Sequence, residues 1–342
     1  MNVVDNLNIK SCPYCDSKNI IRRGIRKNKL QTVQLYICKD CNKTFTPYPI
    51  KNKKYPLKII LEGLTLYNLG NSKEKTIKLL KEKFGINISS KTLSNWIEEL
   101  KYLCTYSRHR QQGKKLYTPN QIIKKLNLNH KQVYEYCYHQ AKLDLITKDF
   151  PSNKSFKIFK EFLETIYQSC PHHYFHQENS RASQTKKLKF SLEQVMVKEK
   201  QNYATRTANL VLQSVKNNRL RHEILQRFML ANDSVTVAVE IPIYLLRKDI
   251  EYMEKVLKFE FPIKPEILTG HIDFIQFRNN QIHILDFKPK SKKDKPYEQL
   301  TWYAIALSRL TGLRLYDFKC AWFDQDHYYE FYPLHMVYKL KP

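Results

Sequence analysis

The chain has 342 residues, enough for about two or three domains that each bury a core of their own. Hydrophobic residues make up 42% of the chain and aromatic residues 13%, which excludes an intrinsically disordered protein. Lysine and arginine number 59 against 32 aspartate and glutamate residues, and the resulting net charge of +27 favours binding to a polyanion such as nucleic acid. Lysine-rich codon usage would also raise the lysine content, but it tends to raise the acidic residues as well.

The sequence contains neither a membrane-spanning nor a secretory pattern. No run of about 18 apolar residues is present, and the first residues lack a basic flank followed by an apolar stretch. We therefore expect no membrane association and a cytoplasmic, nucleoid-associated protein. Eight cysteines in such a chain point to metal ligands or free thiols rather than to disulfides.

Two CxxC pairs lie near the N-terminus. They comprise Cys12, Cys15, Cys38 and Cys41. Because two intervening residues let a turn aim both thiolates at one ion, the two pairs can complete a tetrahedral shell around a structural Zn²⁺. Residues 31–37 alternate as a strand that leads into the second pair. The pattern predicts a zinc ribbon over residues 1–50.

Basic side chains gather between the two cysteine pairs. Arg22, Arg23 and Arg26 lie in the segment expected to form a loop there. Guanidinium groups in such a loop can bind the phosphates of a DNA backbone. We expect these three residues to be part of a DNA-binding surface.

Apolar spacing predicts three short helices after the ribbon, over residues 55–69, 72–84 and 91–100. Gly70 ends the first helix and Gly85 the second, since glycine readily adopts the left-handed conformation that closes a helix. Three short helices of which the last is well capped are typical of a helix-turn-helix, and a plain helical bundle is the alternative.

The last helix would enter the major groove of DNA, with base contacts near its N-terminus. The residues expected to make them are Lys91, Thr92, Ser94 and Asn95. We assign residues 51–104 to this helix-turn-helix domain.

Residues 12–100 resemble the N-terminal region of insertion-sequence transposases. The resemblance rests on the CPYC and CKDC motifs and on the segment KTLSNWI at residues 91–97. In that family a DDE catalytic domain of RNase H fold follows. Here no strand carrying a catalytic aspartate appears soon after Trp96, so a DDE transposase is disfavoured.

The middle of the chain, residues 105–200, is expected to be helical and to end in a linker. Helices over residues 118–126 and 130–143 would form either a second helix-turn-helix or a helical spacer, and the sequence leaves both open. The polar segment 171–189 is the candidate linker.

A cysteine and three histidines follow one another closely in this region, namely Cys170, His172, His173 and His176. This spacing suits a metal ion, but no second cluster of ligands lies nearby in the sequence. The role of the three histidines is left open.

The C-terminal part has an α/β pattern. β-branched and aromatic residues predict strands over residues 235–244, 270–277 and 282–288, the last two joined by a turn at 278–281. The period of two places Asp286 and Lys288 on one face of the third strand.

Asp273 lies on the second strand of this predicted hairpin, where its carboxylate can approach that of Asp286. Two convergent carboxylates bind Mg²⁺ or Mn²⁺, hard cations that prefer oxygen ligands. Such a cation polarises a phosphate and lowers the pKa of a bound water, and Lys288 can stabilise the developing charge.

This arrangement resembles the PD-(D/E)XK nuclease superfamily. Gln299 and Tyr303, four residues apart on a predicted helix, match the QxxxY motif of its RecB-like branch, as in the CRISPR-associated RecB-like nucleases. His222 and its neighbour Glu223, on a helix before the first strand, match the upstream histidine of that branch. Glu240 matches a frequent acidic position on the first strand.

The resemblance implies a restriction-endonuclease-like α/β domain, which we place at residues 201–342. It also implies a role for each matching residue. Metal binding falls to His222, Asp273, Asp286 and the carbonyl of Phe287, catalysis to Lys288, and orientation of substrate or lysine to Gln299 and Tyr303. The nearest cysteines, Cys170 and Cys320, do not supply the four that an iron–sulfur cluster of some relatives requires, so no such cluster is expected.

The sequence therefore predicts a multidomain α+β protein that acts as a Mg²⁺- or Mn²⁺-dependent DNA nuclease, an endonuclease of a mobile element or a defence system. A homodimer, or a helicase or recombinase as partner, would be compatible with this reading. The alternative is a DNA-binding regulator or transposon accessory protein whose nuclease fold is inactive.

Overall fold

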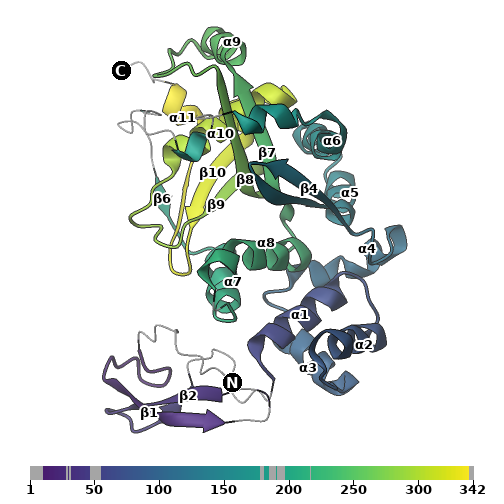
Figure 1. Cartoon of the computed structure of the whole chain (residues 1–342), viewed down its shortest axis with the longest axis vertical. Coiled ribbons are helices and arrows are strands. Elements are labelled where there is room, and N and C mark those ends of the chain that lie inside the picture. The colour runs from purple at the N-terminus through teal and green to yellow at the C-terminus, as the bar shows by residue number, and fades with distance from the viewer. Residues whose placement is uncertain are drawn as a thin grey trace.

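The computed structural model shows three parts stacked along the long axis of the molecule: a small β-rich unit, a group of helices and a large α/β domain (Figure 1). This confirms the expected multidomain α+β organisation. The structure describes residues 11–27, 30, 32–46, 55–177, 181–184, 190, 197–215 and 217–338. Among the helices of these ranges, none combines the length and the apolar composition that crossing a bilayer requires.

The N-terminal unit is a three-stranded antiparallel sheet with the order β1-β2-β3. Its strands are β1 (Ile20–Lys27), β2 (Thr32–Cys38) and β3 (Thr44–Phe45). The expected strand before the second cysteine pair is β2, apart from its first residue, which lies outside the described residues. Arg22, Arg23 and Arg26 lie on β1 and not in a loop, because this segment pairs with β2 on both sides of a register shift at Arg23.

Three helices follow, as the sequence predicts: α1 (Leu57–Asn68), α2 (Lys73–Phe84) and α3 (Ser90–Glu99). The hydroxyl of Ser72 accepts a hydrogen bond from the backbone N–H of Lys75, and that of Ser89 accepts one from Thr92, so both N-termini are capped. Gly85 ends α2 with a left-handed φ of 67°.

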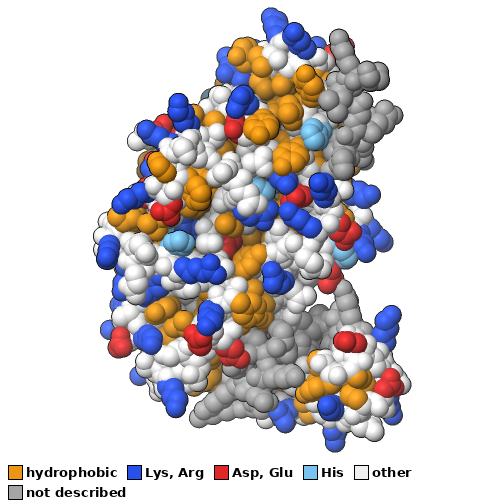
Figure 2. All heavy atoms as spheres, turned by 180° about the vertical axis from the view of Figure 1, so that it is seen from behind, with side chains coloured by type: hydrophobic (Ala, Val, Ile, Leu, Met, Phe, Trp, Pro, Cys, Tyr) orange, Lys and Arg blue, Asp and Glu red, His pale blue; other side chains and the backbone are white. Residues whose placement is uncertain are grey.

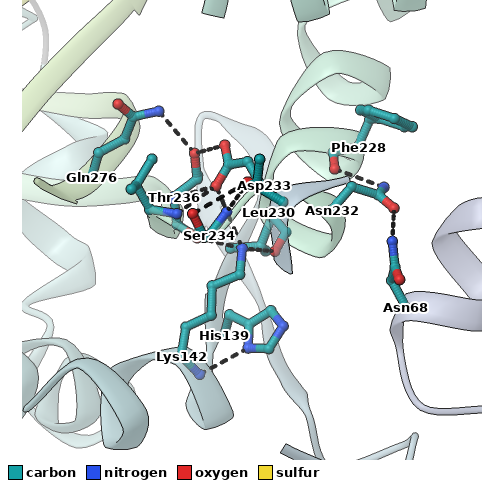
Figure 3. A network of polar contacts seen from close by, with 12 residues as sticks. Asn68, His139, Lys142, Phe228, Leu230, Asn232, Asp233, Ser234, Thr236 and Gln276 are labelled. Carbon is teal, nitrogen blue, oxygen red and sulfur yellow. Dashed lines mark hydrogen bonds and ion pairs between the residues drawn. The ribbon is translucent and has the colours of Figure 1, made fainter. Parts of the chain in front are cut away.

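The three-helix unit packs on the α/β domain through α1, which lies against α8 (Arg221–Asn232). At this contact the side-chain amide of Asn68 donates to that of Asn232 over 2.7 Å, as Figure 3 shows. Arg227 pairs with Glu62 over 2.7 Å. Buried residues of α1 and α3 belong to the same apolar cluster as those of α7 (Tyr203–Leu212) and α8. The unit therefore shares a core with the large domain.

The next segment contradicts the expectation of helices at 118–126 and 130–143. It forms a hairpin, β4 (Ile123–His130) and β5 (Gln132–His139), preceded by α4 (Arg110–Leu116) and followed by α5 (Gln140–Asp149). Tyrosines occupy every second position of β5 and favour a strand, and the pairing of Cys137 with Val239 joins it to β7 (Thr236–Leu246). A second helix-turn-helix at this place is therefore wrong.

The large domain is built on an eight-stranded sheet with the order β4-β5-β7-β8-β9-β10-β11-β6. Only β9 and β10 pair in parallel among the strand pairs that the described residues form. The remaining strands are β6 (Lys198–Glu199), β7 (Thr236–Leu246), β8 (Ile267–Arg278), β9 (Gln281–Phe287), β10 (Phe318–Phe323) and β11 (Tyr328–Phe331). The sheet thus begins well before the domain boundary expected at residue 201.

Helices cover both faces of this sheet. The α-helices not yet named are α6 (Lys154–Ser169), α9 (Arg247–Leu257), α10 (Tyr297–Thr311) and the short α11 (Leu334–Val337). Residues of α6, α9 and α10 pack against one face, whereas α7 and α8 pack against the other. The predicted β8–β9 hairpin is confirmed: Asn279 and Asn280 both have positive φ and form its turn.

The expected linker at 171–189 is wrong for the part of it that the structure describes. Phe175 and Ala182 are each 3% exposed, and Arg181 forms a bridge to Thr269 of β8. The segment packs on the domain because its apolar side chains find partners there. Residues 178–180 and 185–189 lie outside the described residues.

A buried lysine connects α5 with the turn between α8 and β7 (Figure 3). The ammonium group of Lys142 donates to the carbonyls of Leu230 and Thr236 over 2.6 and 3.0 Å. It also lies 3.6 Å from a carboxylate oxygen of Asp233, and both side chains are 1% exposed. Since a buried charge must be paired and hydrogen-bonded, this network holds α5 in one position.

Candidate active site

Two aspartates lie side by side where β8 and β9 begin to separate. The strands pair as far as Phe274 and Leu285, and the next residues along are Asp273 and Asp286. A carboxylate oxygen of Asp273 accepts a hydrogen bond from the backbone N–H of Phe287 over 2.9 Å. Asp286 is only 3% exposed. The hairpin therefore brings the buried carboxylate of Asp286 and the partly buried carboxylate of Asp273 to one place.

Lys288 follows directly after β9. Its ammonium nitrogen lies 2.8 Å from Oδ2 of Asp286, so the two side chains point to the same side of the chain. The backbone N–H of Lys288 donates to the carbonyl of Phe323 over 2.9 Å. This bond continues the pairing with β10 and fixes the position of the lysine.

His222 reaches the same place from the first turn of α8. Its Nδ1 lies 3.4 Å from Oδ2 of Asp273, and its ring contacts the ring of Phe287 edge-on at 5.1 Å between centroids. The His222 side chain is 39% exposed, against 14% for Asp273. The site is therefore open to solvent at His222.

A third carboxylate comes from β7. Val239 and Ile241 pair with Phe274 and Ile272, which places Glu240 level with Asp273. Glu240 has a left-handed φ of 53°, a conformation that a non-glycine residue in a strand rarely adopts. Three adjacent strands thus present Glu240, Asp273 and Asp286 in one row.

Gln226 holds this row from α8, one turn after His222. Its side-chain amide donates to Oε1 of Glu240 over 2.8 Å and to the backbone carbonyl of Asp273 over 3.2 Å. Sequence reasoning missed Gln226, although its spacing of four from His222 places both on one helix face.

Gln299 and Tyr303 are neighbours on α10, as their spacing predicts. The amide of Gln299 donates to the hydroxyl of Tyr303 over 2.7 Å, and Tyr303 is 3% exposed. A Cβ at Gly270 would lie 2.4 Å from Cε1 of Tyr303, so the ring approaches β8 only because residue 270 is glycine. This role of Gly270 was also missed.

Negative charge is concentrated at the site. Burial, and next the charge of Asp273, raise the pKa of Asp286 to about 7, and the same two causes raise the pKa of Glu240 to about 7. Burial alone would raise the pKa of Asp273 as well, but the hydrogen bond and charge of His222 and the charge of Lys288 outweigh it and lower that pKa.

The neighbouring carboxylates also shift the pKa values of the two basic side chains of the site. Burial would lower the pKa of His222 and of Lys288, but the neighbouring carboxylates raise both. Arg181, which lies in the segment expected to be a linker, lowers the pKa of Glu240 through its charge. Nothing in the sequence around Arg181 points to the site, because only tertiary packing brings it there. Glu223 is exposed.

Three groups of the described residues bring possible metal-ligand atoms within 4.8 Å of one another. They are Cys12, Cys15, Cys38 and Cys41; His130, Cys170 and His172; and Asp324, Asp326 and His327. The trio of His222, Asp273 and Asp286 is not among these groups. Its donor set nevertheless fits Mg²⁺ or Mn²⁺, since a divalent cation would compensate the crowded carboxylates that raise the pKa of Asp286.

The four N-terminal cysteines fit a structural zinc site. Sγ of Cys12 lies 3.6 Å from Sγ of Cys41, and Sγ of Cys15 lies 3.6 Å from Sγ of Cys38. Tetrahedral Zn–S bonds of about 2.3 Å would separate the sulfurs by about 3.8 Å. The cluster therefore fits a zinc ribbon, as predicted.

The expected DNA-binding residues lie at two surfaces. Lys91 and Asn95 are exposed on α3, whereas Thr92 and Ser94 are half-buried. The hydroxyl of Ser94 donates to the carbonyl of Ser90 over 2.9 Å. Of the three arginines, all exposed on β1, Arg23 also contacts the hydroxyl of Thr44.

Comparison with known proteins agrees with the geometry of this site. The family model of the PD-(D/E)XK nuclease superfamily matches residues 163–328. No significant match was found to a curated protein or to a solved structure. The matched range runs from α6 to β11 and includes the row of carboxylates, Lys288 and α10. Residues 163–328 of this chain therefore form a domain of the PD-(D/E)XK nuclease superfamily, whose members are in general metal-dependent nucleases.

Proposed function

We propose that this protein is a Mg²⁺- or Mn²⁺-dependent deoxyribonuclease, and specifically an endonuclease. The observation that carries the proposal is the row of Glu240, Asp273 and Asp286 across three adjacent strands, with Lys288 paired to its last member over 2.8 Å. A row of buried and partly buried carboxylates beside a lysine, two of them with pKa values raised to about 7, is costly for a fold and is typical of catalytic sites.

Each residue of the site has a distinct role in this proposal. His222, Asp273, Asp286 and the carbonyl of Phe287 would hold the divalent cation, with Glu240 beside them. When bound, the cation polarises the scissile phosphate and lowers the pKa of a water ligand. Lys288 stabilises the negative charge that develops on the phosphate.

In this proposal Gln299 and Tyr303 orient other groups and do not bind the metal ion themselves. Their mutual hydrogen bond and the close packing of Tyr303 on Gly270 fix both side chains against β8, the strand that carries Asp273. Fixed polar groups at such a place orient the substrate or the lysine. A loss of either residue should therefore slow cleavage less than the loss of Asp273 or Asp286.

The N-terminal parts would bring the enzyme to its DNA. The zinc ribbon exposes arginines on β1, and α3, as the recognition helix of a helix-turn-helix, exposes Lys91 and Asn95. Lysine and arginine side chains are also spread over the face of the molecule that Figure 2 shows, with acidic side chains between them. The net charge of +27 supports DNA as the substrate.

This combination suits an enzyme of a mobile element or a defence system that works at the nucleoid in the cytoplasm. A second copy of the chain, a helicase or a recombinase would be a compatible partner. A RecB-like origin of the domain accounts for the QxxxY pair on α10.

A DNA-binding regulator with an inactive nuclease fold is the competing function. In such a protein the three carboxylates and Lys288 would have no task that offsets the cost of burying them. The intact ion pair between Lys288 and Asp286 favours the enzyme.

Cleavage assays on the full chain test the proposal. Supercoiled, linear and single-stranded DNA are incubated with Mg²⁺, with Mn²⁺ and without added metal, and nicking or linearisation of the supercoiled form reports an endonuclease. Asp273→Ala and Asp286→Ala should abolish cleavage, and Lys288→Ala should slow it by about 10²-fold or more, as for other single electrostatic stabilisers. Gln299→Ala and Tyr303→Ala should be milder.

Glu223→Ala is the matched control, because Glu223 is exposed and adjacent to His222. It should cleave normally, whereas His222→Ala should not. If the unmutated chain bound DNA tightly and left every substrate intact with both metals, the regulator would be the correct reading. Unchanged cleavage by the Asp286→Ala protein would place the active site elsewhere.

A further inference from the structure

A second cluster of metal-binding side chains lies beside the nuclease site. Cys170 and His172 come from the segment that follows α6, and His130 comes from the end of β4, 40 residues earlier than Cys170. Nε2 of His130 lies 2.9 Å from Nδ1 of His172 and 4.0 Å from Sγ of Cys170. All three ligand atoms lie within 4.8 Å of one another.

These distances are close to those of a tetrahedral zinc site. With Zn–N bonds of about 2.0–2.1 Å and a Zn–S bond of about 2.3 Å, two nitrogens lie about 3.4 Å apart and a nitrogen and a sulfur about 3.6 Å apart. The two separations measured from Nε2 of His130 differ from these by about half an ångström, which small side-chain rotations can supply. One thiolate and two imidazoles are also a ligand set that suits zinc better than Mg²⁺.

The surroundings hold His130 in the orientation that such a site needs. Its second ring nitrogen, Nδ1, lies 2.8 Å from Nε2 of His271, and Phe175 stacks on its ring at 3.8 Å between centroids. Metal-binding histidines commonly have such a partner on the nitrogen that does not bind the ion, because that hydrogen bond sets the tautomer. His271 is in turn stacked on Tyr134 of β5, at 3.7 Å between centroids.

Burial differs among the three side chains. His130 is 2% exposed, Cys170 is partly exposed and His172 is exposed. The cluster therefore has a closed inner side and an open outer side. Three protein ligands would leave the fourth position of a tetrahedral ion to water.

We propose that His130, Cys170 and His172 bind a Zn²⁺ ion that fastens the β4–β5 hairpin to the segment after α6. The hydrogen bond from Lys131 to the carbonyl of Gln177, over 2.8 Å, joins the same two segments. Through His271, which lies two residues before Asp273 on β8, the ion also supports the strand that carries a carboxylate of the nuclease site. The zinc site does not depend on the proposed nuclease activity.

Zinc analysis of the untagged full chain tests this proposal. The protein is saturated with Zn²⁺ and desalted, without a polyhistidine tag because such a tag binds zinc itself. We expect about two zinc ions per chain, one in the four-cysteine ribbon and one in the His130 cluster. Cys12→Ser should remove the first, whereas Cys170→Ser and His172→Ala should each remove the second.

His173→Ala and His176→Ala are matched controls, since both side chains are exposed and neither belongs to the cluster. They should keep about two ions. His172 is itself exposed, so its loss should leave the fold intact. Amide hydrogen exchange of residues 123–139 should nevertheless become faster in His172→Ala and not in His173→Ala. Only His172→Ala removes the zinc ion that links the hairpin to the segment after α6.

Two results would overturn the proposal. One is a single zinc ion per chain that disappears in Cys12→Ser. In that case His172, His130 and His271 form only a hydrogen-bonded chain. The other is an unchanged zinc content in both Cys170→Ser and His172→Ala. Neither result bears on cleavage by Asp273 and Asp286, which is measured separately.

Discussion

Two carboxyl groups of the site, Asp286 and Glu240, have pKa values raised to about 7 by burial and by the charge of Asp273. In the metal-free protein each therefore takes up a proton near neutral pH. A carboxyl group whose pKa is higher in the folded than in the unfolded state stabilises the fold below its unfolded value of about 4, and this stabilisation is lost as the pH rises to about 7. A bound cation has the opposite preference, because it needs ionised ligands.

We therefore predict that Mn²⁺ raises the melting temperature of the protein more at pH 8 than at pH 6. The measurement is thermal unfolding of zinc-saturated protein with and without added Mn²⁺ at each pH. In Asp286→Asn the rise itself should become small at both pH values, because a carboxylate ligand is lost, and the difference between the two pH values should shrink with it. A rise of equal size at both pH values would show that metal binding does not remove protons from Asp286 and Glu240.

A second prediction at this scale concerns Gly270. A Cβ there would lie 2.4 Å from the Tyr303 ring, closer than side-chain atoms approach one another. Gly270→Ala should destabilise the fold by about 1–3 kcal/mol, the usual cost of overpacking, and slow cleavage because Tyr303 must move away from Gln299. Denaturant unfolding and cleavage rates measure the two effects.

Replacing Tyr303 by a smaller residue provides the control for the effect of Gly270→Ala. In a Tyr303→Leu background the ring is absent, so Gly270→Ala should cost markedly less than in the unmutated protein. Such non-additivity is expected for residues in direct contact. Equal costs in both backgrounds would mean that the ring does not limit residue 270.

Among the structural elements, α8 connects two parts of the molecule. Its first turn carries His222 of the nuclease site, and its last turns carry Arg227 and Asn232, which contact α1. One helix thus sets the position of the proposed recognition unit relative to the carboxylates. The turn that follows α8 is in turn held by Lys142 of α5.

We predict that Lys142→Met destabilises the protein by about 3 kcal/mol, as is usual when one partner of a buried charge pair is removed. The substitution leaves two carbonyl groups and the buried carboxylate of Asp233 without their cation. Lys148→Met, on the exposed end of the same helix, is the control and should be nearly neutral. Denaturant midpoints decide between them, and equal midpoints for the two variants would contradict the role of Lys142.

At the scale of the whole molecule, the shared core of α1, α3, α7 and α8 decides how DNA binding can be tested. Deleting the three-helix unit would expose this core, so surface substitutions are the better probe. Lys91→Ala combined with Asn95→Ala should weaken binding to duplex DNA and leave the melting temperature unchanged, because both side chains are exposed. The salt dependence should also become shallower, because the variant has one cationic side chain fewer at the DNA.

Lys255→Ala is the control for this prediction, since Lys255 is exposed on α9, at the end of the molecule away from α3 (Figure 1). It should bind DNA nearly as the unmutated protein does. Binding isotherms at several salt concentrations give the affinity and its slope for each protein. If the two variants lost affinity equally, net charge and not α3 would account for binding.

Local spacing was enough to predict several parts of this protein. The CxxC pairs, the caps of α2 and α3, and the β8–β9 hairpin with its Asn279–Asn280 turn all follow from residues close together in the chain. So does the placement of Gln299 and Tyr303 on one helix. Such features depend on turns, caps and periodicities that operate over a few residues, and the sequence therefore determines them by itself.

Only the tertiary structure decided the rest. Residues 123–139 form strands because β5 pairs with β7, a distant strand, and this pairing overrides the helical spacing expected from the sequence. The left-handed backbone of Glu240, and the approach of Gln226 and Arg181 to it, depend on α8 and β8 being in place. His130 meets Cys170 and His172 across 40 residues for the same reason. Contacts between distant segments are set by packing of the whole domain, and sequence patterns that span a few residues do not encode them individually.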